Sequence, residues 1–137
     1  MTIKEVCKKY DITADTLRYY ERVGVIPAVK RTAGGIREYD EEAIRWVESA
    51  IFMRNSGVPV DALTEYVRLF QEGDDTFRAR KELLEAVRAD VQAKLDSYKE
   101  ALRRLDYKIS RYDEAIRTGV LTWDKPVVSA ENAGDEA

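Results

Sequence analysis

The segment 76–118 limits most strongly what this chain can fold into. It contains no glycine or proline, so as one continuous helix it would extend for ~65 Å at about 1.5 Å per residue. Its apolar residues recur with heptad spacing. From Val91 onward every a and d position is apolar or Tyr, whereas Lys81 and Arg88 occupy the two a positions before it. A lone helix cannot bury such a seam, so the pattern predicts a coiled coil with a partner helix.

The natural partner for this helix is a second copy of the chain, because no other segment offers a matching helix. The heptad alone is compatible with a parallel or an antiparallel pair. The seam of the predicted homodimer consists of Val91, Leu95, Tyr98, Leu102, Leu105, Ile109, Tyr112 and Ile116.

The N-terminal residues have the signals of two short helices joined by a turn. Thr2 and Glu5 form a capping-box pattern that begins the first helix. Thr13 can cap a second helix over about residues 14–23, and Gly24 favours its end. Such a pair is typical of a helix-turn-helix unit, whose second helix enters the major groove through its N-terminal half.

A basic loop follows the second helix and reverses at Gly34-Gly35, which predicts a small β wing. Further helices are expected over about 41–56 and from Pro59 to Glu72. The predicted fold is therefore all-α with a small β wing. A winged helix-turn-helix domain covers residues 1–73, a coiled-coil dimerisation helix covers 74–119, and a small, polar, acidic tail at 120–137 is expected to be partly disordered.

The distribution of charge favours double-stranded DNA as a partner. The whole chain has a net charge of −3. Residues 1–37 contain eight Lys or Arg and four Asp or Glu, a local charge of +4, so the remaining residues carry −7. DNA affinity follows such local basic charge more than the total.

Several classes of function are excluded by composition. The chain has no histidine and one cysteine, Cys7. It therefore cannot form an intramolecular disulfide or a cysteine-cluster metal site, and no nucleophile–base pair is available to an enzyme. No cofactor is implied. Short apolar runs predict no membrane span, and the first residues lack the apolar core of a signal peptide, which favours the cytoplasm. Cys7 is either an inert small hydrophobe or a sensing thiol.

Candidate DNA contacts lie on the second helix and in the basic loop. Arg18 suits bidentate contacts to phosphate or guanine, with a solvated helix face as the alternative. Tyr20 either packs inside or contacts DNA, and Tyr39 either donates to a phosphate or fills the base of the wing. The small first-turn side chains permit close approach to bases, and the loop cations can bind phosphates. These candidates are Thr13, Ala14, Thr16, Arg18, Tyr19, Tyr20, Lys30, Arg31, Arg37 and Tyr39.

A group of aromatic residues is a candidate effector pocket. It would lie where the third and fourth helices meet the long helix of the partner, although ordinary core and interface packing is the alternative. The residues are Trp46, Phe52, Tyr66, Phe70 and Trp123.

The runs TLRYYERVGVIP, KR, GGIREYDEEAIRWV and MRNSGV resemble the MerR family of bacterial transcription regulators. The likeness covers the winged unit at 1–73, and the helix at 76–118 matches the family's dimerisation helix in place and length. The resemblance implies an antiparallel homodimer that binds a near-palindromic promoter element. Such a dimer distorts the spacer when an effector is present, so that RNA polymerase engages both promoter boxes. It also implies that Arg54 reaches the DNA backbone, with a salt-bridged surface as the alternative.

The resemblance does not identify the effector. The cysteines of the family's metal and redox sensors are absent. The sequence motifs are most similar to those of the small aldehyde- or electrophile-responsive regulators, in which a reactive Cys precedes Met-Arg-Asn. Phe52 stands there in this chain, which excludes thiol sensing at that position. Two other functions stay open: an architectural or recombination-accessory DNA-bending protein without an effector switch, and an interaction protein that acts through its coiled coil.

Overall fold

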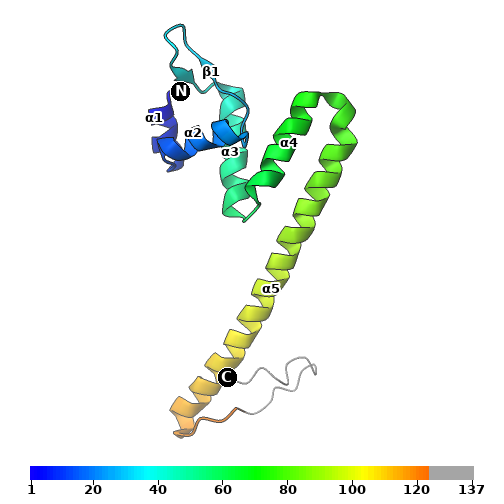
Figure 1. The fold of residues 1–137 in the computed structure, drawn as a ribbon. Helices are drawn as coiled ribbons and strands as arrows, with labels where there is room; N and C mark the ends of the chain where they lie inside the picture. Colours follow the sequence, from blue (N-terminus) through cyan, green and yellow to red (C-terminus); the bar gives the residue numbers. More distant parts are fainter. Residues whose placement is uncertain (124–137) are drawn as a thin grey trace. The chain divides into compact units, whose positions relative to one another are not determined.

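The computed structural model describes residues 1–123 and is helical apart from one short hairpin (Figure 1). The predicted fold class, all-α with a small β wing, is confirmed. The chain forms two compact units, which divide inside the longest helix after Val91. The elements are α1 (Ile3–Tyr10), α2 (Ala14–Val23), β1 (Lys30–Arg31), β2 (Arg37–Glu38), α3 (Glu41–Asn55), α4 (Val60–Glu72), the 3-10 turn η1 (Asp74–Thr76) and α5 (Phe77–Thr118).

The first three helices begin at residues whose side chains cap them. The hydroxyl of Thr2 accepts from the backbone N–H of Glu5 at 3.2 Å, and a carboxylate oxygen of Asp40 accepts from the N–H of Ala43 at 2.9 Å. Helix α2 ends at Gly24, where φ is +87°, a left-handed conformation that glycine adopts without steric cost. These caps use hydrogen-bond donors that have no partner inside the helix.

The core of the first unit joins α1, α2 and α3 to the base of the hairpin. Val6, Leu17 and Val47 are completely buried, one from each helix. Ile26 and Tyr39, which are 1 % exposed, close this cluster beside the hairpin. The short hairpin is therefore attached to a core made mainly of helices.

Helix α4 buries Val67 and Leu69. Phe70, next to Leu69, is 41 % exposed. The ring of Phe70 lies edge-on to Trp46 of α3, with centroids 5.1 Å apart, and the Arg80 guanidinium lies 5.2 Å from its centroid. Phe70 thus packs at the rim of the core, where its other side stays open to solvent.

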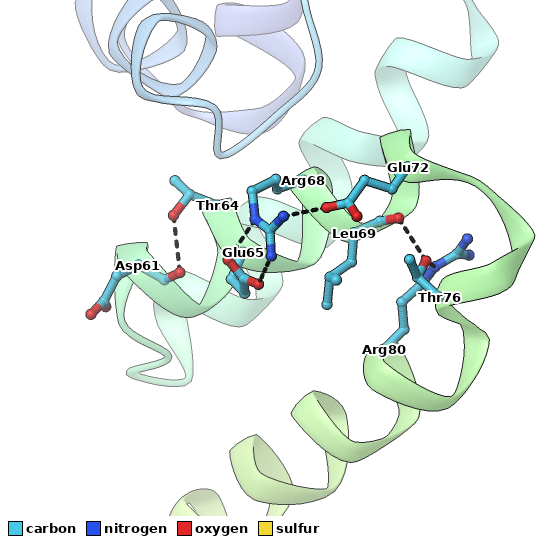
Figure 2. Close-up of polar contacts among 8 residues, drawn as sticks. All are labelled: Asp61, Thr64, Glu65, Arg68, Leu69, Glu72, Thr76 and Arg80. Carbon is cyan, nitrogen blue, oxygen red and sulfur yellow. Dashed lines mark hydrogen bonds and ion pairs between the residues drawn. The ribbon is translucent and has the colours of Figure 1, made fainter.

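The connection from α4 to α5 is held by a compact set of hydrogen bonds (Figure 2). Thr76 donates its hydroxyl to the carbonyls of Leu69 and Gly73, each at 2.7 Å. Arg80 donates to the Thr76 hydroxyl at 2.9 Å and to the Gly73 carbonyl at 2.7 Å. One guanidinium from the first turns of α5 therefore hydrogen-bonds to the Gly73 carbonyl and the Thr76 hydroxyl, which joins the end of α4 to the start of α5.

Helix α5 has no buried residue along its length. All eight residues of the predicted seam are exposed, from 36 % for Val91 to 83 % for Ile116. In the second unit, Trp123 lies edge-on to Tyr112, with centroids 5.8 Å apart, and Arg111 donates to the Thr122 carbonyl at 2.8 Å. The segment after α5 thus folds back onto the end of that helix. Of the tail predicted to be partly disordered, residues 124–137 lie outside the described residues.

Candidate nucleic-acid interface

The first turn of α2 presents small polar side chains. Thr13 is the N-cap, and its hydroxyl accepts from the N–H of Thr16 at 3.1 Å. The two threonine hydroxyls also hydrogen-bond each other at 2.8 Å. Ala14, between them, is half-buried. The side chains of this turn are short, so the end of the helix that the sequence predicts to enter DNA is not blocked by bulky groups.

Arg18 and Tyr19 extend from the next turn of α2 and are exposed. Arg18 pairs with Asp15 at 3.2 Å, but the Asp15 side chain is 96 % exposed. Exposed pairs contribute only ~0–1 kcal/mol, so a phosphate or a base can replace this carboxylate. The Arg22 guanidinium lies 5.4 Å from the centroid of the Tyr19 ring, which gives α2 a second exposed cation.

Tyr20 and Tyr39 are buried, in contrast to Tyr19. Tyr20 is 8 % and Tyr39 is 1 % exposed, and both belong to the core cluster. Burial raises the pKa of the Tyr39 phenol, whose hydroxyl has no hydrogen-bond partner among residues 1–123. Of the two roles considered for each residue, packing agrees with the structure and DNA contact does not, because the core encloses both rings.

The wing, residues 30–38, is a minimal antiparallel hairpin. Lys30 pairs with Glu38 and Arg31 with Arg37 across its two strands. Gly35 has a φ of +82°, as the tight reversal requires, and its carbonyl accepts from Arg31 at 2.7 Å. The wing projects from the helical part of the first unit (Figure 1). Lys30 and Arg31 are exposed on it, so both cations are accessible to phosphates.

Lys30 also pairs with Asp40, the N-cap of α3. Its ammonium lies 2.9 Å from a carboxylate oxygen of Asp40. The hydrogen bond that Lys30 donates to Asp40 raises the pKa of Lys30. The hydrogen bond from the Ala43 N–H, followed by the one from Lys30, lowers the pKa of Asp40. The pair therefore stays charged at neutral pH and lies where the wing joins α3.

Arg37 is placed differently from the other two wing cations. Its Nε donates to Glu21 of α2 at 2.6 Å, and the side chains of Arg37 and Glu21 are only 23 % and 14 % exposed. The second carboxylate oxygen of Glu21 accepts from the backbone N–H of Val29 at 2.9 Å. Burial raises the pKa of Glu21, but the hydrogen bonds from Arg37 and Val29 and the charges of Arg37 and Arg31 outweigh it, so the net pKa is lowered.

Sequence reasoning missed Glu21, although a signal was present. Glu21 is the single acid between residues 16 and 37, a segment that contains five Lys or Arg. An isolated acid in a basic segment indicates a specific partner, because an unpaired carboxylate there would weaken phosphate binding.

Arg54 lies near the end of α3 and supports the turn into α4. Its guanidinium donates to the carbonyl of Val58 at 2.6 Å and is partly buried. The structure thus places it against backbone, which differs from the salt-bridged surface considered as an alternative. Its approach to the DNA backbone stays a prediction.

The candidate effector residues are not all brought together. Trp46, Tyr66 and Phe70 meet between α3 and α4, with the Trp46 and Tyr66 centroids 6.0 Å apart. They line an open groove of about 320 Å³ with Glu42, Arg45 and Ser49. Phe52 is 69 % exposed and does not line this groove. Trp123 belongs to the second unit, where it contacts Tyr107 and Tyr112.

Two further features bear on function, a metal site and a membrane span. Within the described residues 1–123, no group of three or more His, Cys, Asp and Glu is arranged to hold a metal ion. None of the helices described there is both long and apolar enough to cross a membrane. Cys7 is half-buried against the core cluster.

Comparisons with known proteins agree with this architecture. A family model described as MerR HTH family regulatory protein matches residues 1–69. The HTH-type transcriptional regulator AdhR of Bacillus subtilis (strain 168) is 57 % identical over 84 residues, 61 % of this chain. The chain thus spans 60 % of the length of AdhR. The family model is described as a regulatory protein and AdhR is named as a transcriptional regulator. Both agree with the prediction that the chain is not an enzyme.

Two solved structures are similar over most of the chain. The crystal structure of a putative MerR family transcriptional regulator from Listeria monocytogenes has a TM-score of 0.83 and 41 % identity, covering 87 % of this chain and 90 % of that one. The crystal structure of HiNmlR, a MerR family regulator lacking the sensor domain, bound to promoter DNA, has a TM-score of 0.77 and 28 % identity. That match covers 88 % of this chain and 95 % of HiNmlR.

Proposed function

The chain belongs to the MerR family of helix-turn-helix regulatory proteins, and we propose that it binds promoter DNA as a homodimer and distorts the spacer. One observation carries this proposal: α2 and the wing, both with exposed cations, are joined by a largely buried ion pair between Glu21 and Arg37. Two basic elements held in one orientation suit a duplex. The likeness to HiNmlR, whose structure contains promoter DNA, supports the same conclusion.

Helix α2 would supply the contacts to bases. Thr13, Ala14 and Thr16 allow its N-terminal turn to approach the major groove closely. Arg18 can exchange its exposed partner Asp15 for a guanine edge or a phosphate. Tyr19 adds an exposed hydroxyl and ring on the next position. These contacts would carry the sequence preference of the protein.

The wing would supply the contacts to phosphates. Lys30 and Arg31 are exposed on one strand, and such contacts orient a protein on the duplex without reading its sequence. The turn between α3 and α4, supported by Arg54, is the third element proposed to reach the backbone.

The dimer would form through the exposed seam of α5. The seam is self-complementary in an antiparallel pair centred between Leu102 and Leu105. Each a residue then faces a d residue of the partner subunit: Leu102 faces the partner's Leu105, and Val91 faces the partner's Ile116. The apolar stretch pairs with itself over its full length, with no residue left over at either end.

Charges beside the seam support the antiparallel orientation. In this register Lys99 approaches Asp106 of the partner subunit, and symmetry repeats the pair. In a parallel pair Lys94 would face the partner's Lys99, which offsets the attraction between Lys108 and the partner's Asp113. The antiparallel pair therefore gains an attraction between opposite charges beside the seam, whereas in the parallel pair such an attraction is offset by a repulsion between like charges.

Distortion of the spacer would be the regulatory step, with RNA polymerase affected indirectly. Bending or untwisting DNA costs energy that depends on its sequence, so a dimer that holds two half-sites can shift the spacing between promoter boxes. The groove beside Trp46, Tyr66 and Phe70 is the part of the first unit proposed to receive an effector.

The test is fluorescence anisotropy of the purified chain on DNA upstream of its own gene, across a salt series. We expect specific binding whose logarithm falls steeply with the logarithm of salt, because several phosphates are contacted. A scrambled fragment and the Arg78→Ala variant, which removes an exposed cation from α5, are the controls. Equal affinity for both DNAs would favour an architectural DNA-bending protein, and no binding to either would refute the proposal.

A further inference from the structure

We infer that Glu21 is a positioning residue for DNA binding, which fixes the wing to the recognition helix α2 and holds Arg37 away from the DNA backbone. This inference rests on the proposed function. It assigns to Arg37 a role different from the phosphate contact that the sequence predicts, and it gives Glu21 a role in holding the wing.

The carboxylate of Glu21 connects α2 to β2 of the wing and to the residue directly before β1. One oxygen accepts from the N–H of Val29, the residue directly before β1. The other accepts from the Nε of Arg37 in β2. One side chain therefore holds β2 directly and β1 through the residue before it, and Arg37 pairs with Arg31 of β1 across the hairpin.

The wing has little structure of its own to resist movement. Each strand has two residues, and the register comprises two pairs. An isolated two-stranded hairpin is at best marginally stable, so the orientation of the wing depends on contacts with the rest of the unit. The Glu21 carboxylate is one such contact, and it comes from the recognition helix itself.

Electrostatics alone would not place an acid here. Glu21 is the single acid among the cations of residues 16–37, and a negative charge beside bound DNA opposes phosphate binding. Its side chain is 14 % exposed, so it is also largely removed from water. The carboxylate of Glu21 therefore both opposes phosphate binding and loses contact with water. A fixed geometry of the two proposed DNA-binding elements would compensate for these two costs.

The two possible roles of Arg37 predict opposite changes in DNA affinity for the substitution Glu21→Gln. If Arg37 binds phosphate, Glu21→Gln removes a negative charge and releases the guanidinium, so DNA affinity should rise. If Glu21 positions the wing, Glu21→Gln should lower affinity although the protein becomes more positive. The direction of the change therefore separates positioning from charge.

The experiment compares four variants with the wild-type chain by anisotropy on the promoter fragment. We expect Glu21→Gln and Arg37→Gln each to lower affinity about tenfold, because displaced elements lose contacts that they make only when aligned. The double variant should be no weaker than Arg37→Gln, since both changes break one interaction. The matched control is Glu65→Gln, which removes an acid paired with Arg68 on α4 (Figure 2); its affinity should change less than about twofold.

Hydrogen exchange on the DNA-free protein provides a second readout. Glu21→Gln should speed exchange in peptides covering residues 28–38 and leave those of α3 unchanged, which a general loss of stability would not do. If that variant is too unstable to study, Arg37→Lys keeps the charge and loses the Nε donor. It should weaken binding as Arg37→Gln does.

The outcomes distinguish this inference from the proposed function. Equal or tighter binding by Glu21→Gln, together with weaker binding by Arg37→Gln, would overturn the positioning role and restore Arg37 as a phosphate contact. Unchanged exchange in the wing would overturn it as well. Failure of the wild-type chain to bind promoter DNA would overturn the proposed function, and the positioning role with it.

Discussion

Replacing Leu102 by Asp tests the seam at its centre. Leu102 is 59 % exposed and Leu105 is 54 % exposed in the chain by itself. Complete burial of a leucine side chain contributes about 1.5–3 kcal/mol, so covering the exposed part of Leu102 contributes about 1–2 kcal/mol. The two-fold symmetry repeats this contact, so the substitution removes about 2–4 kcal/mol of dimer stability from burial alone.

The introduced carboxylate adds a second cost. In the proposed register each Asp would face Leu105 of the partner subunit, and an unpaired charge in an apolar layer costs several kcal/mol more. We therefore expect the dissociation constant of the dimer to rise at least about 1,000-fold, since every ~1.4 kcal/mol is a factor of ten.

Sedimentation velocity over a range of concentrations measures this change. The wild-type chain should sediment as a dimer and Leu102→Asp as a monomer of 15.7 kDa. Ala93→Asp is the matched control, because it introduces the same charge at an exposed f position on the outer face of α5 and should leave the dimer intact. A Leu102→Asp dimer as tight as the wild type would refute the register.

Three further results are expected. Arg18→Ala should lower DNA affinity by about 1–3 kcal/mol in anisotropy if Arg18 reads a base; unchanged affinity would remove that assignment. Arg80→Ala should lower the free energy of unfolding in urea by about 1–3 kcal/mol, because it removes a charged donor to the Gly73 carbonyl and the Thr76 hydroxyl, whereas exposed Arg78→Ala should have little effect. Because its folded-state pKa is lowered from 4.5, Glu21 should stabilise the fold above pH 4.5 and lose this contribution as the pH falls through its folded pKa. The difference in unfolding free energy between wild type and Glu21→Gln should therefore be constant at neutral pH and shrink under acid; a difference that grows would contradict the lowered pKa.

The helices could be predicted from sequence because their ends depend on nearby residues. The cap at Thr13 uses a donor three residues away, and the left-handed conformation at Gly24 needs only a residue without a side chain. Helix α2 begins and ends at the residues predicted. Helix α3 ends at Asn55, one residue before the expected end, where Ser56 forms the C-cap.

The proposed DNA-binding surface follows from the sequence in outline and not in detail. Local charge and the helix-turn-helix pattern located α2 and the wing cations. Spacing along a helix does not decide which of two neighbouring tyrosines faces the core, because that depends on the elements packed against it. The completely buried Val6, Leu17 and Val47 mark where α1 and α3 pack against α2. Tyr20 lies in the same cluster, while Tyr19 remains exposed.

The sequence by itself determined the helix ends to within about one residue, the basic N-terminal part and the heptad pattern of α5, because each depends on residue types at short, regular spacings. Only the tertiary structure decided that Tyr39 closes the core and that Arg37 pairs with Glu21, 16 residues away. That pairing requires the chain to reverse twice between the two residues. No local preference encodes such a return, and it forms because the hydrophobic core brings α2 and the wing together.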